Sequence, residues 1–155
     1  MSQRQRLIVG ISGASGALYG VRALALLRQC QVETHLVVSR AGMLTVQHEL
    51  GLTRQALHAL ADVVHPANAI GATIASGSFA TAGMLIAPCS VRTLSEIAYG
   101  VTASLMSRAA DVILKERRKL VLMVRETPLH LGHLRTLVSL TEAGSIIMPP
   151  VPAFY

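Results

Sequence analysis

The stretch RLIVGISGASG, residues 6–16, decides the fold of this chain. After Arg6 its first residues are uncharged and mostly β-branched or leucine, which is typical of a buried strand. The glycines and serines of residues 12–16 then end the strand, and apolar residues at helical spacing follow from Leu18 onward. A strand, a glycine-rich turn and a helix in this order indicate the opening unit of a parallel α/β sheet.

The alternation of strands and helices continues to the end of the chain. Short apolar runs between turn residues predict strands, and apolar residues that recur every three or four positions predict helices. The expected strands are residues 6–11, 33–38, 62–65, 84–88, 120–124 and 145–148. The expected helices are one that carries Leu18 to Leu27 and those at residues 40–50, 57–60, 93–98, 103–117 and 131–143. The stretch 67–82, made of small residues with little periodicity, predicts a loop.

Near-continuous apolar strands separated by helices are typical of a parallel sheet that is covered on both faces. We therefore predict an α/β fold, a three-layer α/β/α arrangement with a mostly parallel sheet of the Rossmann or flavodoxin type. The length of 155 residues suits one such domain, spanning residues 1–155. In such sheets ligands bind beyond the carboxyl ends of the strands, so the residues that follow each strand are the candidates for a binding site.

Hydrophobic residues make up 52% of the chain and charged residues only 14%, which excludes an intrinsically disordered protein. Because an average domain carries about 25% charged residues, we expect apolar surface to be covered by other copies of the chain in a homo-oligomer. No apolar run reaches the roughly 18 residues of a membrane-spanning helix, and no signal peptide follows the basic start. We expect no membrane association and a cytoplasmic location.

The net charge of +6 raises the question of a nucleic-acid partner. The chain has no Trp, two Phe and three Tyr, too few rings to stack on bases, and no nucleic-acid-binding motif. The basic residues gather in one stretch, which favours a small phosphorylated ligand: Arg108, Lys115, Arg117, Arg118, Lys119 and Arg125. We therefore expect no nucleic acid as a partner.

No metal site is predicted from the cysteines and histidines. Cys30 and Cys89 belong to no metal-ligand or Cys-x-x-Cys pattern, and we expect both to be reduced thiols. His130 and His133 have the spacing of two ligands on one helix face, but the sequence shows no third ligand.

Two turns rich in glycine or hydroxyl groups follow predicted strands. Gly13 to Gly16 precede a helix whose first amide groups attract an anion. The alternative is that these glycines serve packing and Ser15 caps the helix. Ser90 to Thr93 offer hydroxyls and helix amide groups to a phosphate or ribityl chain, or else Ser90 only caps that helix.

Arg108 and Lys115 are seven residues apart, so both project from one face of a helix toward one cleft, where they suit a dianionic phosphate. The spacing alone favours a solvated basic face on which Asp111 and Glu116 are their local partners. Both interpretations are open at this stage.

Arg125 and Glu126 directly follow a buried strand. Because an unpaired buried charge is costly, we expect both side chains to be placed for function. The pattern predicts that Arg125 binds a phosphate and that Glu126 transfers a proton.

Six motifs follow one another along the chain: Ser12-Gly-Ala-Ser-Gly-Ala17, Pro88-Cys-Ser-Val-Arg-Thr-Leu94, Arg108-Ala-Ala-Asp-Val, Leu114-Lys-Glu-Arg-Arg118, Val124-Arg-Glu-Thr-Pro-Leu129 and Pro149-Pro-Val-Pro-Ala-Phe-Tyr155. Together they resemble the UbiX family of flavin prenyltransferases, of the type found in bacterial ubiquinone biosynthesis. The resemblance covers essentially the whole chain, and the order of several long motifs makes it specific.

The resemblance implies that residues 1–155 form one flavin-binding domain with transferase activity. Dimethylallyl phosphate and reduced FMN are joined through bonds at N5 and C6 of the isoalloxazine. The product, prenylated FMN, is the cofactor of a UbiD-type decarboxylase. The family needs no metal and forms homo-oligomers, dodecamers among them. A phosphate leaving group held by Arg and Lys agrees with the concentration of positive charge.

By the same resemblance, contacts to FMN are expected from Gly13, Ala14, Ser15, Ser39, Ser90, Val91, Arg92, Thr93 and Arg125. Ser15 and Glu49 match a family pair that relays protons near flavin N5, and Glu126 is the expected acid at the prenyl phosphate. That phosphate is expected to lie among Arg108, Lys115, Arg125 and Tyr155.

Family members continue past the Phe-Tyr motif with a further helix that supplies a basic phosphate ligand, whereas this sequence stops at Tyr155. One alternative is therefore a catalytically impaired FMN-binding carrier subunit. Another is an NAD(P)-binding reductase, since Gly10, Gly13 and Gly16 form a Gly-x-x-Gly-x-x-Gly pattern and Arg40 follows the second strand. The Tyr-x-x-x-Lys pair of short-chain reductases is not found in the sequence.

Overall fold

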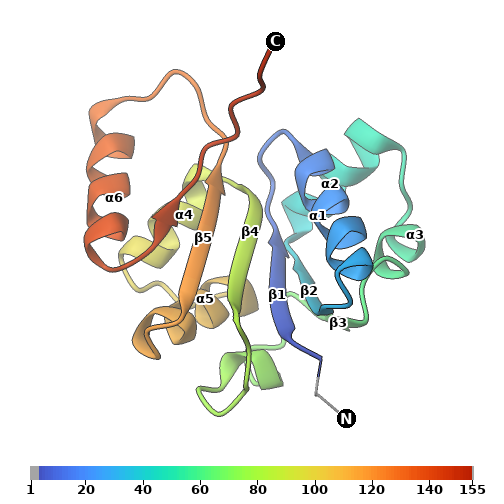
Figure 1. The fold of residues 1–155 in the computed structure, drawn as a ribbon. Helices are drawn as coiled ribbons and strands as arrows, with labels where there is room; N and C mark the ends of the chain where they lie inside the picture. The colour runs from blue at the N-terminus through green and yellow to red at the C-terminus, as the bar shows by residue number, and fades with distance from the viewer. Residues whose placement is uncertain (1–3, 155) are drawn as a thin grey trace.

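The computed structural model describes residues 4–154, and its centre is one sheet of parallel strands in the order β3-β2-β1-β4-β5-β6 (Figure 1). The strands are β1 (Arg6–Ile11), β2 (Glu33–Val38), β3 (Val63–His65), β4 (Gly83–Cys89), β5 (Lys119–Val124) and β6 (Ile146–Ile147). The helices are α1 (Ala17–Gln29), α2 (Arg40–Leu50), α3 (Arg54–His58), η1 (Thr73–Ala75), α4 (Val91–Ala98), α5 (Leu105–Lys115) and α6 (Leu131–Glu142).

Helices cover the sheet from both sides. On one face, α1, α2 and α3 pack over β1 and β2 around Leu24, Val46 and Leu57. On the other face, α4, α5 and α6 pack with η1 around a larger core that includes Ile113 and Leu140. The predicted three-layer α/β/α fold with a parallel sheet is therefore confirmed.

Because all neighbouring strands are parallel, their carboxyl ends lie at one edge of the sheet. We call this edge the carboxyl rim; residues 12–16, 39–40, 90–93 and 125–126 follow β1, β2, β4 and β5 there. The amino rim is the opposite edge, where Gly83 and Lys119 pair at the start of β4 and β5. A strand of six residues separates the two rims by about 20 Å.

The bounds of β1, β2 and α2 lie at the predicted residues. Two helices begin earlier than predicted, because polar side chains cap them. The Thr53 side chain accepts a hydrogen bond from the Ala56 amide, so α3 covers residues 54–58 and the prediction of 57–60 is wrong by about one turn. Ser90 caps α4 in the same way, and this helix starts at Val91.

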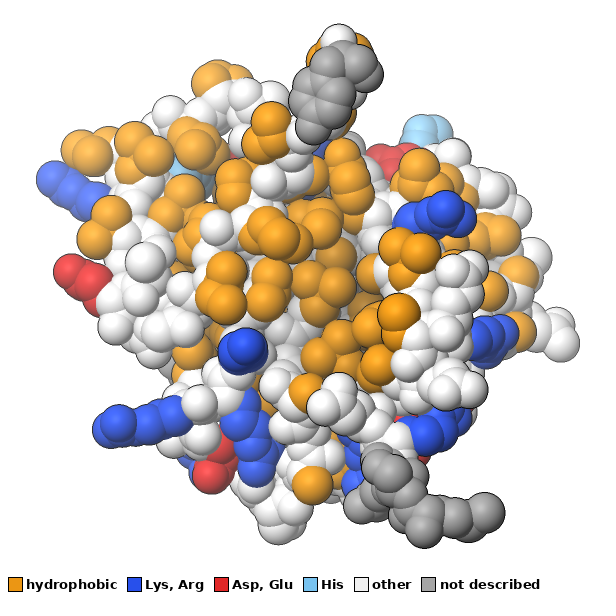
Figure 2. Space-filling model, viewed as in Figure 1, with side chains coloured by type: hydrophobic (Ala, Val, Ile, Leu, Met, Phe, Trp, Pro, Cys, Tyr) orange, Lys and Arg blue, Asp and Glu red, His pale blue; other side chains and the backbone are white. Residues whose placement is uncertain are grey.

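In the described part of the chain, the face of the sheet that carries α1 is covered less completely at β4, β5 and β6 than at β1 and β2, although α1 contacts β4. Side chains that point toward α4 and α5 are buried, whereas Leu85, Val121 and Met123 on the opposite face are only partly buried and Ile146 is 45% exposed. Figure 2 shows apolar side chains gathered over this part of the sheet. A continuous apolar patch is typical of an interaction surface, as the low charged fraction leads us to expect.

Within residues 4–154, no helix combines the length and the apolar character needed to cross a bilayer.

Candidate functional site

Loops from distant parts of the sequence enclose a cavity of about 360 Å³ at the carboxyl rim, which we call the rim cavity. Its lining consists of Gly13, Val37, Ser39, Arg40, Ala41, Ala67, Ser90, Arg92, Thr93, Glu96, Ser104 and Met106. Five of these residues are predicted FMN contacts: Gly13, Ser39, Ser90, Arg92 and Thr93. The other predicted contacts lie on the same rim without lining this cavity: Ala14, Ser15, Val91 and Arg125.

The Ser90 hydroxyl caps α4, as one of the two interpretations of this motif predicts. It accepts a hydrogen bond from the Thr93 amide at 3.2 Å and donates to Thr93 Oγ1 at 3.1 Å. Both residues also line the rim cavity, so capping and ligand binding are compatible. The first amide groups of a helix have no intrahelical partner, so the start of α4 presents donors and positive potential there.

A buried serine ties two loops of the site together. Ser12 donates a hydrogen bond from its hydroxyl to the Pro88 carbonyl at 2.7 Å, and the same hydroxyl accepts one from the Ser90 amide at 2.8 Å. Ser12 is completely buried. The turn after β1 and the turn after β4 are thereby fixed relative to each other. Ser12 opens the first of the six sequence motifs, and no role was predicted for it.

The Glu49 side chain binds the first amide groups of α1. Its carboxylate accepts hydrogen bonds from the Gly16 amide at 3.0 Å and from the Ala17 amide at 2.9 Å. In this chain the anion at these amides is therefore the carboxylate of Glu49, and the alternative that Ser15 caps the helix is wrong. The contact nevertheless places the Glu49 carboxylate beside Ser15, the residue before Gly16, although α2 and this turn lie far apart in sequence.

Gly13 permits a close approach between the turn after β1 and α2. A Cβ atom at Gly13 would lie 2.5 Å from the Cβ of Ala41, closer than two carbon atoms pack. Ala41 lines the rim cavity together with Ser39 and Arg40, the residues at the start of α2. The glycine thus lets two walls of the cavity meet.

The rim cavity is also lined by Glu96, Ser104 and Met106, none of which was a predicted site residue. Ser104 caps α5, and its side chain accepts from the Ser107 amide. The Ser-x-x-Ser spacing before an apolar run is a capping signal from which the position was predictable. Glu96 accepts from Arg92 Nε at 3.0 Å and so orients a guanidinium that is otherwise exposed.

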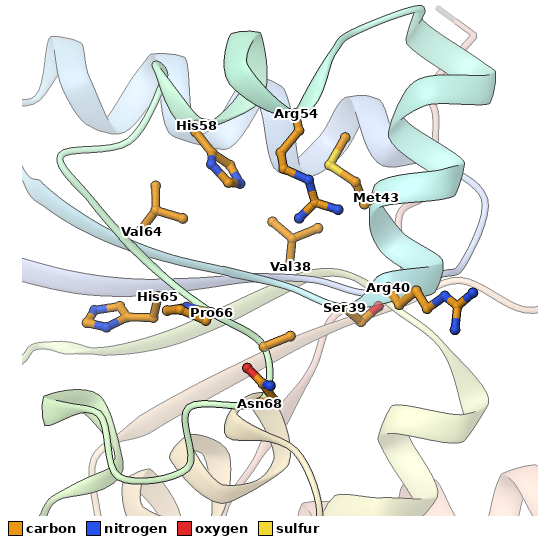
Figure 3. Close-up of a pocket in the computed structure, with 11 residues that line it drawn as sticks. Val38, Ser39, Arg40, Met43, Arg54, His58, Val64, His65, Pro66 and Asn68 are labelled. Atoms are coloured by element: carbon orange, nitrogen blue, oxygen red, sulfur yellow. The ribbon is translucent and has the colours of Figure 1, made fainter.

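A second cavity, of about 530 Å³, adjoins the rim cavity and shares Ser39, Arg40 and Ala67 with it. We call it the side cleft (Figure 3). Figure 3 shows Arg54 and His58 on the α3 side of this space and Met43 on α2. The full lining is Val38, Ser39, Arg40, Met43, Arg54, His58, Val64, His65, Pro66, Ala67 and Asn68.

Arg125 and Glu126 lie at the carboxyl rim after β5, as predicted, but both are exposed. The Arg125 amide donates to the Cys89 carbonyl at 3.2 Å, and Glu126 Oε1 accepts from the Thr127 amide at 3.0 Å. Their charges therefore carry no cost of burial, contrary to the expectation. Both residues directly follow β5, next to the end of β4.

Arg108 and Lys115 have the local partners that the solvated interpretation predicts. Arg108 pairs with Asp111 at 2.9 Å, and Lys115 pairs with Glu116. Because α5 runs from the carboxyl rim to the amino rim, Lys115 lies near the start of β5 and lines a different cavity there. That cavity contains neither Arg108 nor Arg125, the other described residues expected at the prenyl phosphate.

Tyr155, the last predicted phosphate ligand, lies outside the described residues.

A histidine pair lies behind the side cleft. His35 is buried, with Nδ1 3.0 Å from His65 Nε2 and Nε2 2.9 Å from Glu33 Oε1. The hydrogen bond from His35 lowers the pKa of Glu33, and the positive charge of Arg6 acts in the same direction. Burial lowers the pKa of His65, as does the charge of His35. This cluster connects the first three strands.

Among residues 4–154, no group of three or more His, Cys, Asp or Glu side chains is placed to hold a metal ion. His130 and His133 cap the start of α6 with their side chains, and their rings stack at 3.6 Å. Cys30 and Cys89 are free thiols. Burial raises the pKa of the Cys89 thiol to about 12, which keeps it protonated and unreactive at neutral pH.

Comparison with known proteins gives consistent matches over nearly the whole chain. A family model described as Flavoprotein matches residues 1–152. The Flavin prenyltransferase UbiX of Neisseria meningitidis is 59% identical over 151 residues, which are 97% of this chain and 80% of that protein.

Two solved structures are similar at TM-scores near 1. AnUbiX (PadA1) in complex with FMN and dimethylallyl pyrophosphate has a TM-score of 0.97 and 48% identity, covering 99% of this chain and 81% of that one. A dodecameric FMN-dependent Ubix-like decarboxylase from Escherichia coli O157:H7 has a TM-score of 0.95 and 47% identity, covering 97% of this chain and 83% of that one.

Proposed function

The chain belongs to the UbiX family of flavin prenyltransferases, and on this premise we propose that it transfers the prenyl group of dimethylallyl phosphate to reduced FMN. The C–O bond of the prenyl phosphate breaks, and inorganic phosphate leaves with the bonding electrons. The prenyl group forms one bond to N5 and, after its double bond takes up a proton, a second bond to C6. N5 and C6 each lose a proton, so the flavin gains C5H8 overall. The observation that carries the proposal is the rim cavity, whose lining brings together expected flavin contacts from three separate loops, those after β1, β2 and β4.

The rim cavity suits FMN. The starts of α2, α4 and α5 contribute Ser39, Ser90 and Ser104 to its lining, so three helix N-termini direct positive potential at one space. An FMN phosphate and ribityl chain need this combination of amides and hydroxyls. The expected contacts are Gly13, Ala14, Ser15, Ser39, Ser90, Val91, Arg92, Thr93 and Arg125. The flavin itself supplies the nucleophilic ring that receives the prenyl group.

Ser15 and Glu49 handle the proton at flavin N5. The two amide hydrogen bonds from Gly16 and Ala17 hold the Glu49 carboxylate in one orientation beside Ser15. A carboxylate that is fixed by its backbone partners needs no reorganisation when it accepts a proton through a neighbouring hydroxyl.

Arg125 and Glu126 act on the prenyl phosphate from the end of β5, with Glu126 as the acid that protonates the leaving group. Arg108, Lys115 and Tyr155 complete the phosphate site. Since Lys115 lies at the amino rim, its ammonium reaches a phosphate only in the site of another copy. A homo-oligomer is consistent with this requirement, with the incompletely covered apolar face and with the dodecameric relative.

The product serves a UbiD-type decarboxylase, and residues 1–155 act as one flavin-binding domain in this reaction. We place the reaction in the cytoplasm, where the free thiols of Cys30 and Cys89 stay reduced. Charge neutralisation by Arg and Lys replaces a metal at the leaving group.

Anaerobic incubation of the purified protein with reduced FMN and dimethylallyl phosphate tests the function. The expected product is a flavin heavier by one C5H8 unit, formed together with one inorganic phosphate. Bound FMN of unchanged mass would favour the carrier alternative. Because one relative is named a decarboxylase, a parallel incubation with an aromatic carboxylic acid and no second enzyme should release no carbon dioxide.

A further inference from the structure

We infer that the side cleft is a second ligand site, which takes the adenylate group of a nucleotide: a phosphate monoester joined to a flat heterocyclic base. This inference rests on the proposed function, because the side cleft adjoins the cavity to which FMN is assigned.

The charge of the side cleft favours a phosphate. Arg40, Arg54 and His58 line it, and no Asp or Glu does. Within residues 4–154, the side chains of these three residues make no hydrogen bond or ion pair, unlike Arg92 or Arg108. A guanidinium binds a phosphate through two parallel hydrogen bonds, so unpartnered arginines at a cavity are suited to this group.

The size and the walls of the side cleft favour a base in addition to the phosphate. A volume of about 530 Å³ far exceeds that of an inorganic phosphate and lies in the range of nucleotide-sized ligands. Val38, Met43, Val64 and Pro66 form apolar walls, and a thioether makes favourable contacts with aromatic rings. The Asn68 side chain has both donors and an acceptor for the edge of a base.

The shared lining links this ligand to the flavin. Ser39 and Arg40 at the start of α2 belong to both cavities, so a ligand in the side cleft lies next to one in the rim cavity. The adenylate group has two possible sources. It is either a free nucleotide that binds beside FMN, or the adenylate half of FAD whose flavin half occupies the rim cavity.

Calorimetric titration of the FMN-loaded protein with adenosine monophosphate tests the site. We expect adenosine monophosphate to bind, and adenosine and inorganic phosphate each to bind at least about tenfold more weakly, since each lacks half of the contacts. Arg54→Gln should weaken adenosine monophosphate binding about tenfold and change the Kd for FMN less than about twofold. Arg135→Gln, an exposed arginine on α6 at the other end of the sheet, is the matched control and should change neither Kd.

Titration with FAD distinguishes the two possible sources of the adenylate group. If FAD binds flavin-free protein more tightly than FMN does, and Arg54→Gln removes the difference, the adenylate half of a dinucleotide occupies the side cleft. Binding of adenosine monophosphate without such a gain for FAD identifies a free nucleotide. The inference is overturned if adenosine monophosphate displaces FMN, or if Arg54→Gln affects neither ligand. Adenosine monophosphate is also titrated into flavin-free protein, so the side cleft is tested independently of FMN. Failure of the protein to bind FMN therefore contradicts the proposed function and not this inference.

Discussion

The carboxyl rim and the amino rim both gather polar side chains, but they use them differently. At the carboxyl rim, hydrogen bonds join one loop to another and leave a cavity between them. Ser12 bonds to the turn after β4, and Glu49 bonds to the turn after β1. The remaining hydroxyls and helix N-termini face the rim cavity, where a ligand can use them.

At the amino rim, cations are bound to the protein itself. Arg118 donates to the Phe79 carbonyl at 2.7 Å and to the Gly77 carbonyl at 2.8 Å, and so fixes the loop that leads into β4. Lys115 pairs with Glu116, and this ion pair lowers the pKa of the Glu116 carboxyl. The difference teaches that a basic stretch in a sequence need not form one site. Arg118 has a structural role, and α5 places Arg108 nearer the carboxyl rim and Lys115 at the amino rim.

The largest expected effect concerns the carboxyl rim. Glu49→Gln keeps an acceptor for the Gly16 and Ala17 amides but removes the carboxylate that we propose takes a proton, so FMN should stay bound while prenylation slows about a hundredfold or more. Single-turnover assays and flavin titration measure the two quantities. The control is Glu142→Gln, at an exposed position of α6. A variant at position 49 with the wild-type rate would exclude Glu49 from proton transfer.

Lys115→Ala tests the role of a cation at the amino rim. If this ammonium serves the phosphate site of a neighbouring copy, the variant should raise the KM for dimethylallyl phosphate about tenfold or more and leave the Kd for FMN unchanged. Lys119→Ala, on β5 at the same rim, should change neither value.

Mixed oligomers distinguish neighbouring copies from a single chain. Assemblies that contain both Glu49→Gln and Lys115→Ala chains should regain activity, since some of their sites combine an intact Glu49 with an intact Lys115 from another copy. Mixtures no more active than the two separate variants would show that both residues act within one chain.

Ser12→Ala tests whether the loops of the carboxyl rim must be tied together. The substitution removes a completely buried hydroxyl and leaves the partly buried Ser90 amide without its acceptor, so we expect a loss of about 1–3 kcal/mol in the free energy of unfolding and about tenfold weaker FMN binding. Urea unfolding and flavin titration measure these changes, with the exposed Ser139→Ala as control. Unchanged FMN affinity would mean that the two loops hold their positions independently.

The smallest effect is expected in the histidine cluster, away from the rim cavity. Hydrogen bonding to His35 holds the pKa of Glu33 below its ordinary value of 4.5, so the ionised carboxylate stabilises the folded state above that pH. The contribution is lost as the pH falls through the lower folded-state pKa. Wild type should therefore exceed Glu33→Gln in stability at neutral pH, and the difference should shrink under acid. A difference that is constant with pH would contradict this account.

Strand and helix positions were predictable because buried strands and their flanking turns leave a local signal. RLIVGI and ETHLVV are apolar or β-branched between charged ends and turns, and both form strands at the predicted residues. The misplaced start of α3 also had a local cause, the Thr53 cap, which the apolar pattern does not contain.

The site was less predictable. The periodicity of a helix shows which residues share one face, but it does not show which rim of the sheet each residue lies near. Arg108 and Lys115 share a sequence signal, yet seven residues of helix separate them by about 10 Å along the axis. The hydrogen bond that the Gly16 amide donates to Glu49 depends on how α2 packs beside α1, and no pattern in either segment encodes it. The role of Glu49 therefore came only from the family resemblance.

A crystal structure of the protein with bound FMN tests the central claim most directly. The account predicts the flavin phosphate and ribityl chain in the rim cavity, within hydrogen-bond distance of Ser39 and Ser90. Flavin bound instead at the amino rim, between Lys115 and Arg118, would contradict it.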